Sequence, residues 1–180
     1  DIRPAGFILF GYNVSTPDQV RALVDSMRGC VSGYTPMVLI DQEGGKVARL
    51  GPPYWTKRPP AKVFADLAAT DPDGAHEAAR INARLMAHDL TALGIDVDCA
   101  PVVDVPVQGA HDIIGDRAHG QTPELVASLG RAVCEGLMEG GVAPMIKHMP
   151  GHGRARADSH KELPKVDTAR AVLHDTDFHP

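Results

Sequence analysis

Four short apolar runs, set between segments with helical periodicity, constrain the fold of this chain most strongly. Each run is four to six residues long and places apolar residues at consecutive positions, which is typical of strands covered on both faces. Alternation of such strands with helices produces βαβ units, in which the strands run parallel. The sequence therefore predicts an α/β fold with a parallel sheet. The four runs are residues 6–10, 37–40, 95–100 and 142–146.

Three helices are predicted from one recurring N-terminal signal. A hydroxyl or carboxylate side chain precedes a proline at Thr16, Asp71 and Thr122, where it can cap a helix that begins at the proline. Apolar residues then recur at helical spacing in all three segments, and the second helix is expected to run from 71 to 94. The residues expected to face inward are Val20, Leu23, Val24 and Met27 in the first helix, Ile81, Leu85, Met86, Leu90 and Leu93 in the second, and Leu125, Val126, Leu129, Val133 and Leu137 in the third.

Polar residues follow the apolar runs, as they do where parallel strands carry functional side chains at their carboxyl ends. No G-x-G-x-x-G motif follows the first run, so a TIM (β/α)8-type barrel is favoured over a doubly wound sheet. Such a barrel typically needs about 250 residues, whereas 180 residues supply about six βα units. We therefore expect an incomplete barrel, with residues 1–180 as a single domain that lacks its first and last parts.

Composition and charge argue against several classes of protein. The chain has 18 Lys and Arg against 23 Asp and Glu, a net charge of −5, which disfavours a nucleic-acid partner because such proteins usually carry a basic face. No apolar stretch reaches about 18 residues, so no membrane partner is expected. The 3 cysteines form no C-x-x-C pair, which disfavours a disulfide framework or a cysteine zinc site and fits reduced thiols in the cytoplasm.

The densest group of reactive side chains lies in residues 147–160, K-H-M-P-G-H-G-R-A-R-A-D-S-H. Asp158 and His160 are two positions apart, so in a loop the carboxylate can orient the imidazole and stabilise its charged form. Such a pair is a competent general acid/base near neutral pH. The alternative is a solvated loop in which Asp158 caps a helix and His160 has no chemical role.

Zinc binding by three histidines of the same segment is a second interpretation. Imidazoles suit zinc, and catalytic zinc sites often use three protein ligands. Pro150 lies between His148 and His152, however, so these two side chains do not share one helical face. A zinc-dependent hydrolase would use His148, His152 and His160.

Two further groups of polar residues fall outside that segment. Asp41 follows the second apolar run and would project into the mouth of a barrel, and Gly44-Gly45 permits a sharp turn after it. Arg117 offers a rigid fork of donors suited to hydroxyls or carboxylates. The alternatives are a helix N-cap with a solvated charge run in the first group, and a surface ion pair of Asp116 with Arg117 in the second. The remaining histidines are expected on the surface or in loops: His76, His88, His111, His119, His174 and His179.

Taken in order, these motifs resemble the barrel domain of glycoside hydrolase family 3, in particular its bacterial β-N-acetylglucosaminidases. The resemblance covers residues 6–180 and rests on G-F-I-L-F, L-I-D-Q-E-G-G-K-V-A-R-L, G-I-D-V-D-C-A-P-V-V-D-V, G-D-R-A-H-G and L-P-K-V-D, together with the segment 147–160. The K-H-x-P-G-H-G…D-S-H element is the specific part, since the family's β-glucosidases lack the D-S-H loop. Met149 and His119 depart from the residues more usual in this branch.

The resemblance implies a role for each matched residue. Asp41 would bind sugar hydroxyls, and His160 would be the general acid/base with Asp158 as its partner. Retaining hydrolysis also needs a carboxylate nucleophile, which the resemblance places beyond Pro180. No metal or organic cofactor is implied. The residues expected to complete the N-acetylglucosamine pocket are Arg49, Arg117, Lys147 and His148.

The predicted function is that of a cytoplasmic, retaining exo-β-N-acetylglucosaminidase, or β-hexosaminidase. It would hydrolyse terminal N-acetylglucosamine from peptidoglycan fragments or related glycosides, with the small-molecule glycoside as its partner. Three alternatives stay open. They are a phosphorylase of the same fold that releases sugar 1-phosphate, the zinc-dependent hydrolase, and a non-catalytic sugar-binding module.

Overall fold

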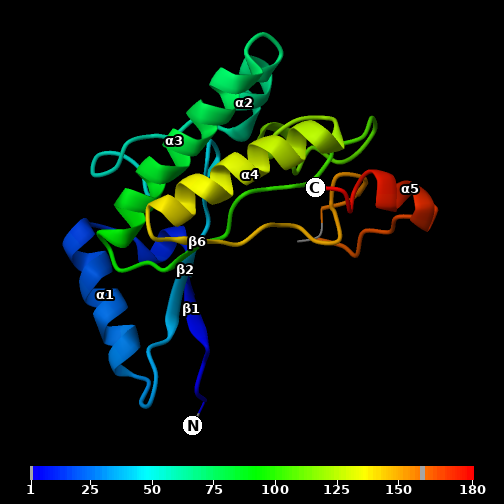
Figure 1. Cartoon of the computed structure of the whole chain (residues 1–180). Helices are drawn as coiled ribbons and strands as arrows, with labels where there is room; N and C mark the ends of the chain where they lie inside the picture. Colours follow the sequence, from blue (N-terminus) through cyan, green and yellow to red (C-terminus); the bar gives the residue numbers. More distant parts are fainter. Residues whose placement is uncertain (1, 159–160) are drawn as a thin grey trace.

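The computed structural model describes residues 2–158 and 161–180, and its centre is a four-stranded parallel sheet (Figure 1). Strands within this sheet stand in the order β1-β2-β5-β6, so they follow the order of the chain. That order is typical of a barrel, whereas a doubly wound sheet reverses its strand order at a switch point. The predicted class is confirmed: the fold is a TIM-barrel-like α/β fold that contains four strands of the barrel sheet. The strands are β1 (Gly6–Leu9), β2 (Met37–Ile40), β5 (Val97–Asp98) and β6 (Ala143–Pro144).

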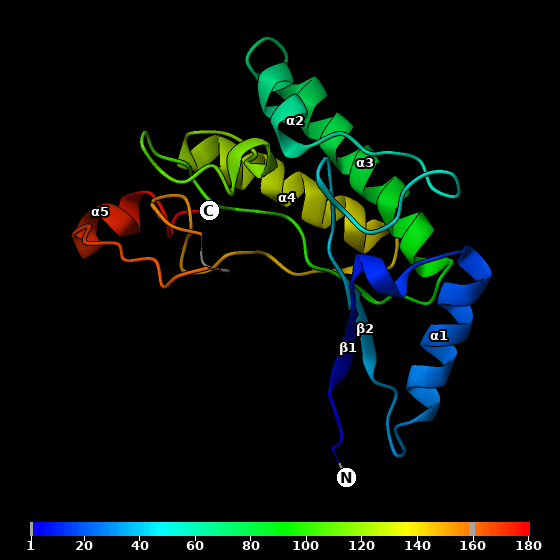
Figure 2. The same cartoon turned by 180° about the vertical axis from the view of Figure 1, so that it is seen from behind.

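Helices α1, α3 and α4 lie on one side of the sheet, whereas α5 lies away from it (Figures 1 and 2). Helix α1 lies beside β1 and β2, and helices α3 and α4 pack against each other across the rest of the core. The shared core buries apolar side chains of both strands and helices, among them Leu9, Val24, Val38, Ile40 and Leu90. No helix of the described residues is long and apolar enough to cross a membrane. The helices are α1 (Pro17–Gly29), α2 (Ala61–Ala68), α3 (Pro72–Thr91), α4 (Pro123–Glu139) and α5 (Arg170–Asp175).

All three predicted helix starts are confirmed. Each capping side chain accepts a hydrogen bond from a backbone N–H three residues later, which satisfies one of the free donors of the first turn. Helix α3 ends at Thr91 rather than at residue 94. The capping pairs are Thr16 with Gln19 at 3.2 Å, Asp71 with Gly74 at 2.9 Å, and Thr122 with Leu125 at 3.4 Å.

The buried face of α3 differs from the prediction. Ile81 and Leu85 are 45% and 47% exposed, although both were expected to face inward with Met86, Leu90 and Leu93, which are buried. The buried face instead carries small side chains that let α4 approach closely. The helical pattern was read from large apolar residues, and alanine contributes too little hydrophobicity to outweigh them. The small buried residues are Ala75, Ala79, Ala83 and Ala87.

The close contact between α3 and α4 depends on Gly136. A Cβ at this position would lie 2.1 Å from the carbonyl oxygen of Arg80 and 2.9 Å from the Cβ of Ala83. We therefore expect Gly136→Ala to lower the free energy of unfolding by about 1–3 kcal/mol, since the two helices must separate. Denaturant unfolding measures the change. Gly29→Ala is the matched control, because a Cβ there meets nothing within 4 Å and is expected to stabilise the helix. A stabilised Gly136→Ala variant would contradict the packing described.

The other face of β1 and β2 is exposed in the described chain. Ile8 is 43% exposed and Met37 50% exposed, whereas the adjacent Leu9 and Val38 are buried. Successive side chains of a strand point to opposite faces, and the helices of the described residues pack on one of them. Within residues 2–158 and 161–180 these two strands are therefore covered on one face only, and cover on the second face stays a prediction.

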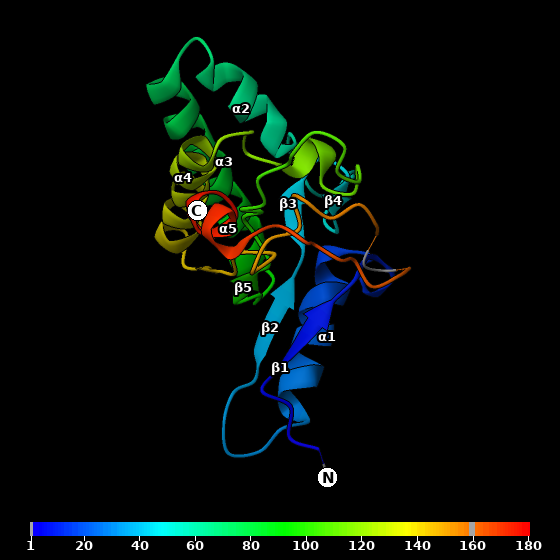
Figure 3. The same ribbon diagram turned by 90° about the vertical axis from the view of Figure 1, so that its right-hand side faces the viewer.

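Several short elements lie outside the predictions. The most important is an antiparallel hairpin of β3 and β4, which lies just beyond the carboxyl end of β2 (Figure 3). It replaces the helix N-cap that was one interpretation of this segment. Helices α2 and α5 and two 3-10 turns were also not predicted. The hairpin strands are β3 (Gln42–Gly44) and β4 (Val47–Ala48), and the turns are η1 (Gly11–Asn13) and η2 (Gly115–Arg117).

Candidate functional site

The β3–β4 hairpin presents two carboxylates at the end of β2. Asp41 follows β2 directly and Glu43 lies in β3, so the two side chains, two residues apart in an extended segment, share one side. The turn that follows is made by Gly44 and Gly45, whose φ angles of +94° and +59° favour glycine. The carboxylates therefore stand on a sharply folded support rather than on a free loop.

The side chain of Gln42 holds this hairpin from the buried side. Its oxygen accepts the backbone N–H groups of Arg49 at 2.8 Å and Leu50 at 2.9 Å, and its amide nitrogen donates to the Leu50 carbonyl at 3.0 Å. A buried amide with these partners has its polar atoms satisfied and fixes the local conformation. The hairpin thus orients Asp41 and Glu43 toward the opposite side.

Two cations bind Asp41. The Lys147 Nζ donates to one carboxylate oxygen of Asp41 at 2.9 Å, and the Arg49 guanidinium donates to the other at 3.1 Å. Lys147 comes after β6, where a bridge to Val102 extends the sheet. Burial alone would raise the pKa of Asp41, but Lys147 and then Arg49 hold it below its ordinary value. Asp41 is therefore an anion with paired donors on both oxygens.

Glu43 forms the most buried ion pair of the site. Arg117 donates to both of its carboxylate oxygens at 2.8 Å, and Lys147 makes a further ion pair with Glu43. The side chains of Arg117 and Glu43 are only 10% and 7% exposed. Burial opposes the charge of Arg117, yet Glu43 keeps the pKa of this guanidinium raised. Such a bidentate pair has a fixed geometry as well as a favourable charge interaction.

His148 is oriented by the buried Asp104. Its Nδ1 lies 2.6 Å from a carboxylate oxygen of Asp104, whose other oxygen accepts the backbone N–H of His152 at 2.6 Å. Burial would raise the pKa of Asp104, but the contacts with His148 and His152 lower it. The Nε2 of His148 lies 3.4 Å from Arg117, which can only donate, so we assign the proton to Nδ1. This imidazole is therefore held in one tautomer.

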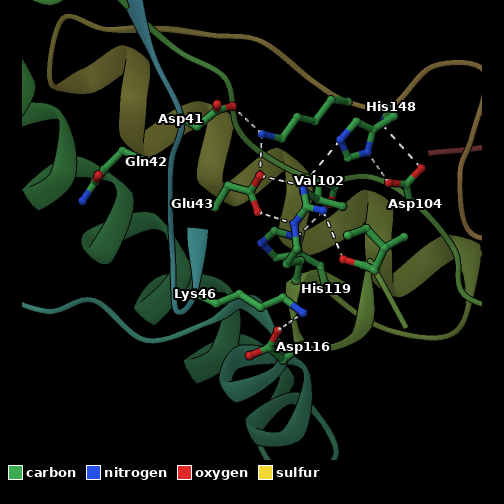
Figure 4. A network of polar contacts seen from close by, with 12 residues as sticks. Asp41, Gln42, Glu43, Lys46, Val102, Asp104, Asp116, His119 and His148 are labelled. Carbon is green, nitrogen blue, oxygen red and sulfur yellow. Dashed lines mark hydrogen bonds and ion pairs between the residues drawn. The ribbon is translucent and has the colours of Figure 1, made fainter. Parts of the chain in front are cut away.

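The structure brings together all five residues predicted to bind the sugar. Figure 4 shows part of this network, with Asp41 and His148 among the labelled residues. Glu43 links Lys147 to Arg117, and Asp104 pairs with His148; neither acid was assigned to the site from the sequence. A cavity of about 220 Å³ opens beside His148 and Asp104, with Met149 and Phe178 among its apolar lining residues. The five predicted residues are Asp41, Arg49, Arg117, Lys147 and His148.

The predicted acid/base pair is described only in part. His160 lies outside the described residues. Asp158 lies in the loop that follows the site, with its carboxylate 4.0 Å from the Nζ of Lys161 and its side chain largely buried. The roles of Asp158 and His160 therefore stay predictions.

His119 lies in a loop, one of the two places expected for it, but it is buried rather than exposed. Its Nδ1 lies 2.9 Å from the carbonyl oxygen of Val102. Burial lowers its pKa, so the imidazole is neutral and packs behind the site. None of the other five histidines expected on the surface is buried.

The zinc interpretation gains no support from the described part of the chain. No group of three or more His, Cys, Asp or Glu side chains in residues 2–158 and 161–180 is arranged to hold a metal ion. The Nδ1 of His148 is engaged by Asp104, and the ring centroids of His148 and His152 are 6.0 Å apart. The third proposed ligand, His160, lies outside the described residues.

Comparison with known proteins gives relatives along nearly the whole chain. A β-hexosaminidase of Alkalilimnicola ehrlichii is 38% identical over 178 residues, which are 99% of this chain and 50% of the relative. A β-hexosaminidase of Methylococcus capsulatus is 39% identical over 160 residues, which are 89% of this chain and 46% of the relative. The chain thus spans about half the length of the curated relatives it matches.

Solved structures agree with these matches. Native NagZ from Neisseria gonorrhoeae superposes with a TM-score of 0.90 at 32% identity, over 97% of this chain and 50% of that one. A family 3 β-N-acetylglucosaminidase from Paenibacillus gives 0.87 at 35% identity, over 97% of this chain and 32% of that one. Residues 2–180 match the glycosyl hydrolase family 3 N terminal domain. The chain therefore belongs to glycosyl hydrolase family 3.

Proposed function

We propose that this chain supplies the sugar-binding site of a retaining exo-β-N-acetylglucosaminidase. The observation that carries the proposal is the network around Asp41, Glu43 and Lys147, in which buried carboxylates and cations alternate. A sugar hydroxyl both donates and accepts, so neighbouring carboxylate and ammonium groups can bind it from both sides. A related NagZ from Neisseria gonorrhoeae has been solved with N-trifluoroacetyl-D-glucosamine, which supports an N-acylated amino sugar as the ligand.

The reaction needs an acid and a base in addition to this site. A retaining glycosidase protonates the departing oxygen and later removes a proton from water. We propose that His160, oriented by Asp158, performs both steps. His148 is the less suitable imidazole, because Asp104 engages its Nδ1 and Arg117 faces its Nε2. We assign no nucleophile to a residue of this chain.

The proposal extends to the setting of the enzyme. Residues 1–180 would form part of a single barrel domain, and terminal N-acetylglucosamine of peptidoglycan fragments would be the substrate. The 3 cysteines are free thiols, which supports a reducing compartment such as the cytoplasm. No cofactor is needed for the proposed chemistry.

The test uses a polypeptide that contains residues 1–180 and is as long as the matched relatives. It is called the full-length polypeptide below. It is incubated with an aryl N-acetyl-β-glucosaminide and with peptidoglycan fragments, with and without phosphate and a metal chelator. We expect free N-acetylglucosamine in every arm, and no activity on the matching aryl β-glucoside. Sugar 1-phosphate would favour the phosphorylase, and chelator-sensitive activity the zinc hydrolase. Tight sugar binding without turnover would reject the enzyme in favour of a binding module.

A further inference from the structure

Asp98 is a buried acid directly behind the candidate site. It ends β5 with its side chain fully buried, at 0% exposure, and stands opposite Ile40 of β2 on one side and Pro144 of β6 on the other. Its carbonyl oxygen accepts the backbone N–H of Met145 at 2.9 Å. The backbone of Asp98 is therefore fixed in the middle of the sheet.

The Asp98 side chain extends the pairing of β5 with β2 by one more hydrogen bond. One carboxylate oxygen accepts the backbone N–H of Gln42 at 2.9 Å, while the backbone N–H of Cys99 donates to the Ile40 carbonyl at 2.8 Å. Asp41 lies between Ile40 and Gln42, so its backbone is held on both sides by residues 98 and 99. The position of the Asp41 carboxylate thus depends on Asp98.

The second carboxylate oxygen of Asp98 is buried and has no hydrogen-bond partner among the described residues. The charged groups that interact electrostatically with Asp98 are Asp41, Glu43 and Lys147. The neighbouring Cys99 thiol, whose pKa burial raises to about 11, is neutral. Burial raises the pKa of Asp98 to about 8, with smaller opposing effects of the Gln42 N–H and Lys147. At neutral pH the acid is therefore protonated, and a third negative charge beside Asp41 and Glu43 is avoided.

We propose that Asp98 is a positioning residue for sugar binding that must carry its proton, an inference that rests on the proposed function of the site. As a neutral acid it holds the Gln42 backbone and leaves Lys147 shared between Asp41 and Glu43. As an anion it competes with both for Lys147 and displaces that ammonium group from the sugar hydroxyls. Loss of one proton at a buried residue then weakens the binding of the sugar.

The first test measures the affinity of the full-length polypeptide for N-acetylglucosamine by calorimetry at pH 7 and pH 9. Since only the protonated form binds well, we expect the wild type to weaken about tenfold. Asp98→Asn keeps an oxygen acceptor for Gln42 and cannot ionise, so its affinity is expected to change less than about twofold. Unchanged affinity in the wild type, or the same pH dependence in Asp98→Asn, would reject the positioning role.

The chain offers a matched control in Asp96→Asn. Asp96 also accepts a backbone N–H of β2, from Val38 at 2.7 Å, but it is partly exposed and pairs with Arg28 at 2.9 Å. Asp96→Asn therefore changes an aspartate that binds a backbone N–H of β2 without altering the candidate sugar site. We expect Asp96→Asn to show the wild-type pH dependence of sugar affinity, and a flattened dependence would contradict the assignment to Asp98.

A readout that needs no sugar separates this inference from the proposed function. Folding raises the pKa of Asp98 above its unfolded value. The contribution of Asp98 to the free energy of unfolding is therefore complete below about pH 4 and is lost as the pH rises to about 8. The unfolding free energy of wild type relative to Asp98→Asn is therefore expected to fall across that window and to level off above it. A flat difference would reject the proton on Asp98, whereas a wild type that binds no sugar would reject the proposed function instead.

A spectroscopic measurement covers the case in which Asp98→Asn does not fold. The infrared band of a protonated carboxyl group in the wild type is expected at pH 7 and is expected to disappear by about pH 9.5. Absence of the band at pH 7 would overturn the proposal without any variant.

Discussion

Glu43→Ala is expected to lower the free energy of unfolding by about 3–5 kcal/mol, because it removes one partner of a buried ion pair. Arg117 makes two 2.8 Å hydrogen bonds to Glu43, and both side chains are nearly inaccessible to solvent. Lys147 loses one of its two carboxylate partners as well. The variant leaves the charged Arg117 buried without the Glu43 carboxylate that pairs with it. Denaturant unfolding of the full-length polypeptide measures the loss.

Two further variants separate lost pairing from lost packing. Glu43→Ala combined with Arg117→Met removes both charges, so it is expected to be more stable than Glu43→Ala alone. Asp66→Ala breaks the exposed pair with Lys62 on α2 and is expected to change stability little, since exposed pairs contribute little. If Glu43→Ala were no more destabilising than Asp66→Ala, the pair would be a solvated contact rather than the support of the site.

The elements that the sequence predicted well are those specified by local chemistry. The run 37–40 is β2 with the same bounds, and the caps at Thr16, Asp71 and Thr122 begin the three predicted helices. Each depends on residues that adjoin one another in the chain. The β3–β4 hairpin was missed because β3 is polar and short and β4 is only two residues long. In addition, the buried Gln42 side chain provides the cross-links that alternating apolar residues usually provide.

The same distinction applies to the site. The five residues predicted to bind the sugar followed from family motifs, but Glu43, Asp98 and Asp104 were not assigned, since their importance comes from burial beside distant partners. Glu43 pairs with Arg117 from 74 positions away, a contact that no local pattern encodes. A signal was present nonetheless: acids that interrupt an apolar run, as Asp98 and Asp104 do over 95–105, are costly to bury without a partner.

His160→Ala is expected to reduce kcat for a natural disaccharide substrate by about 10²–10⁴-fold, the usual contribution of a positioned general acid. In an aryl glycoside of a strongly acidic phenol, the phenolate leaves with little help from a proton. The rate of its glycosylation step is therefore expected to fall much less. The unequal loss of kcat indicates an acid role, because a binding or folding defect would lower the rates on both substrates alike. Steady-state kinetics on both substrates with the full-length polypeptide measure the ratio.

Asp158→Asn and His88→Ala complete this test. Asn keeps the size of Asp158 but removes the charge that would orient and stabilise the imidazolium, so the unequal loss is expected to recur in weaker form. His88 is exposed on α3, and its replacement is expected to leave both rates unchanged. Equal losses on the two substrates in His160→Ala would contradict the acid role. The proton donor would then have to be sought elsewhere, and the zinc interpretation, which needs His160 as a ligand, would be tested next by metal analysis of the same variant.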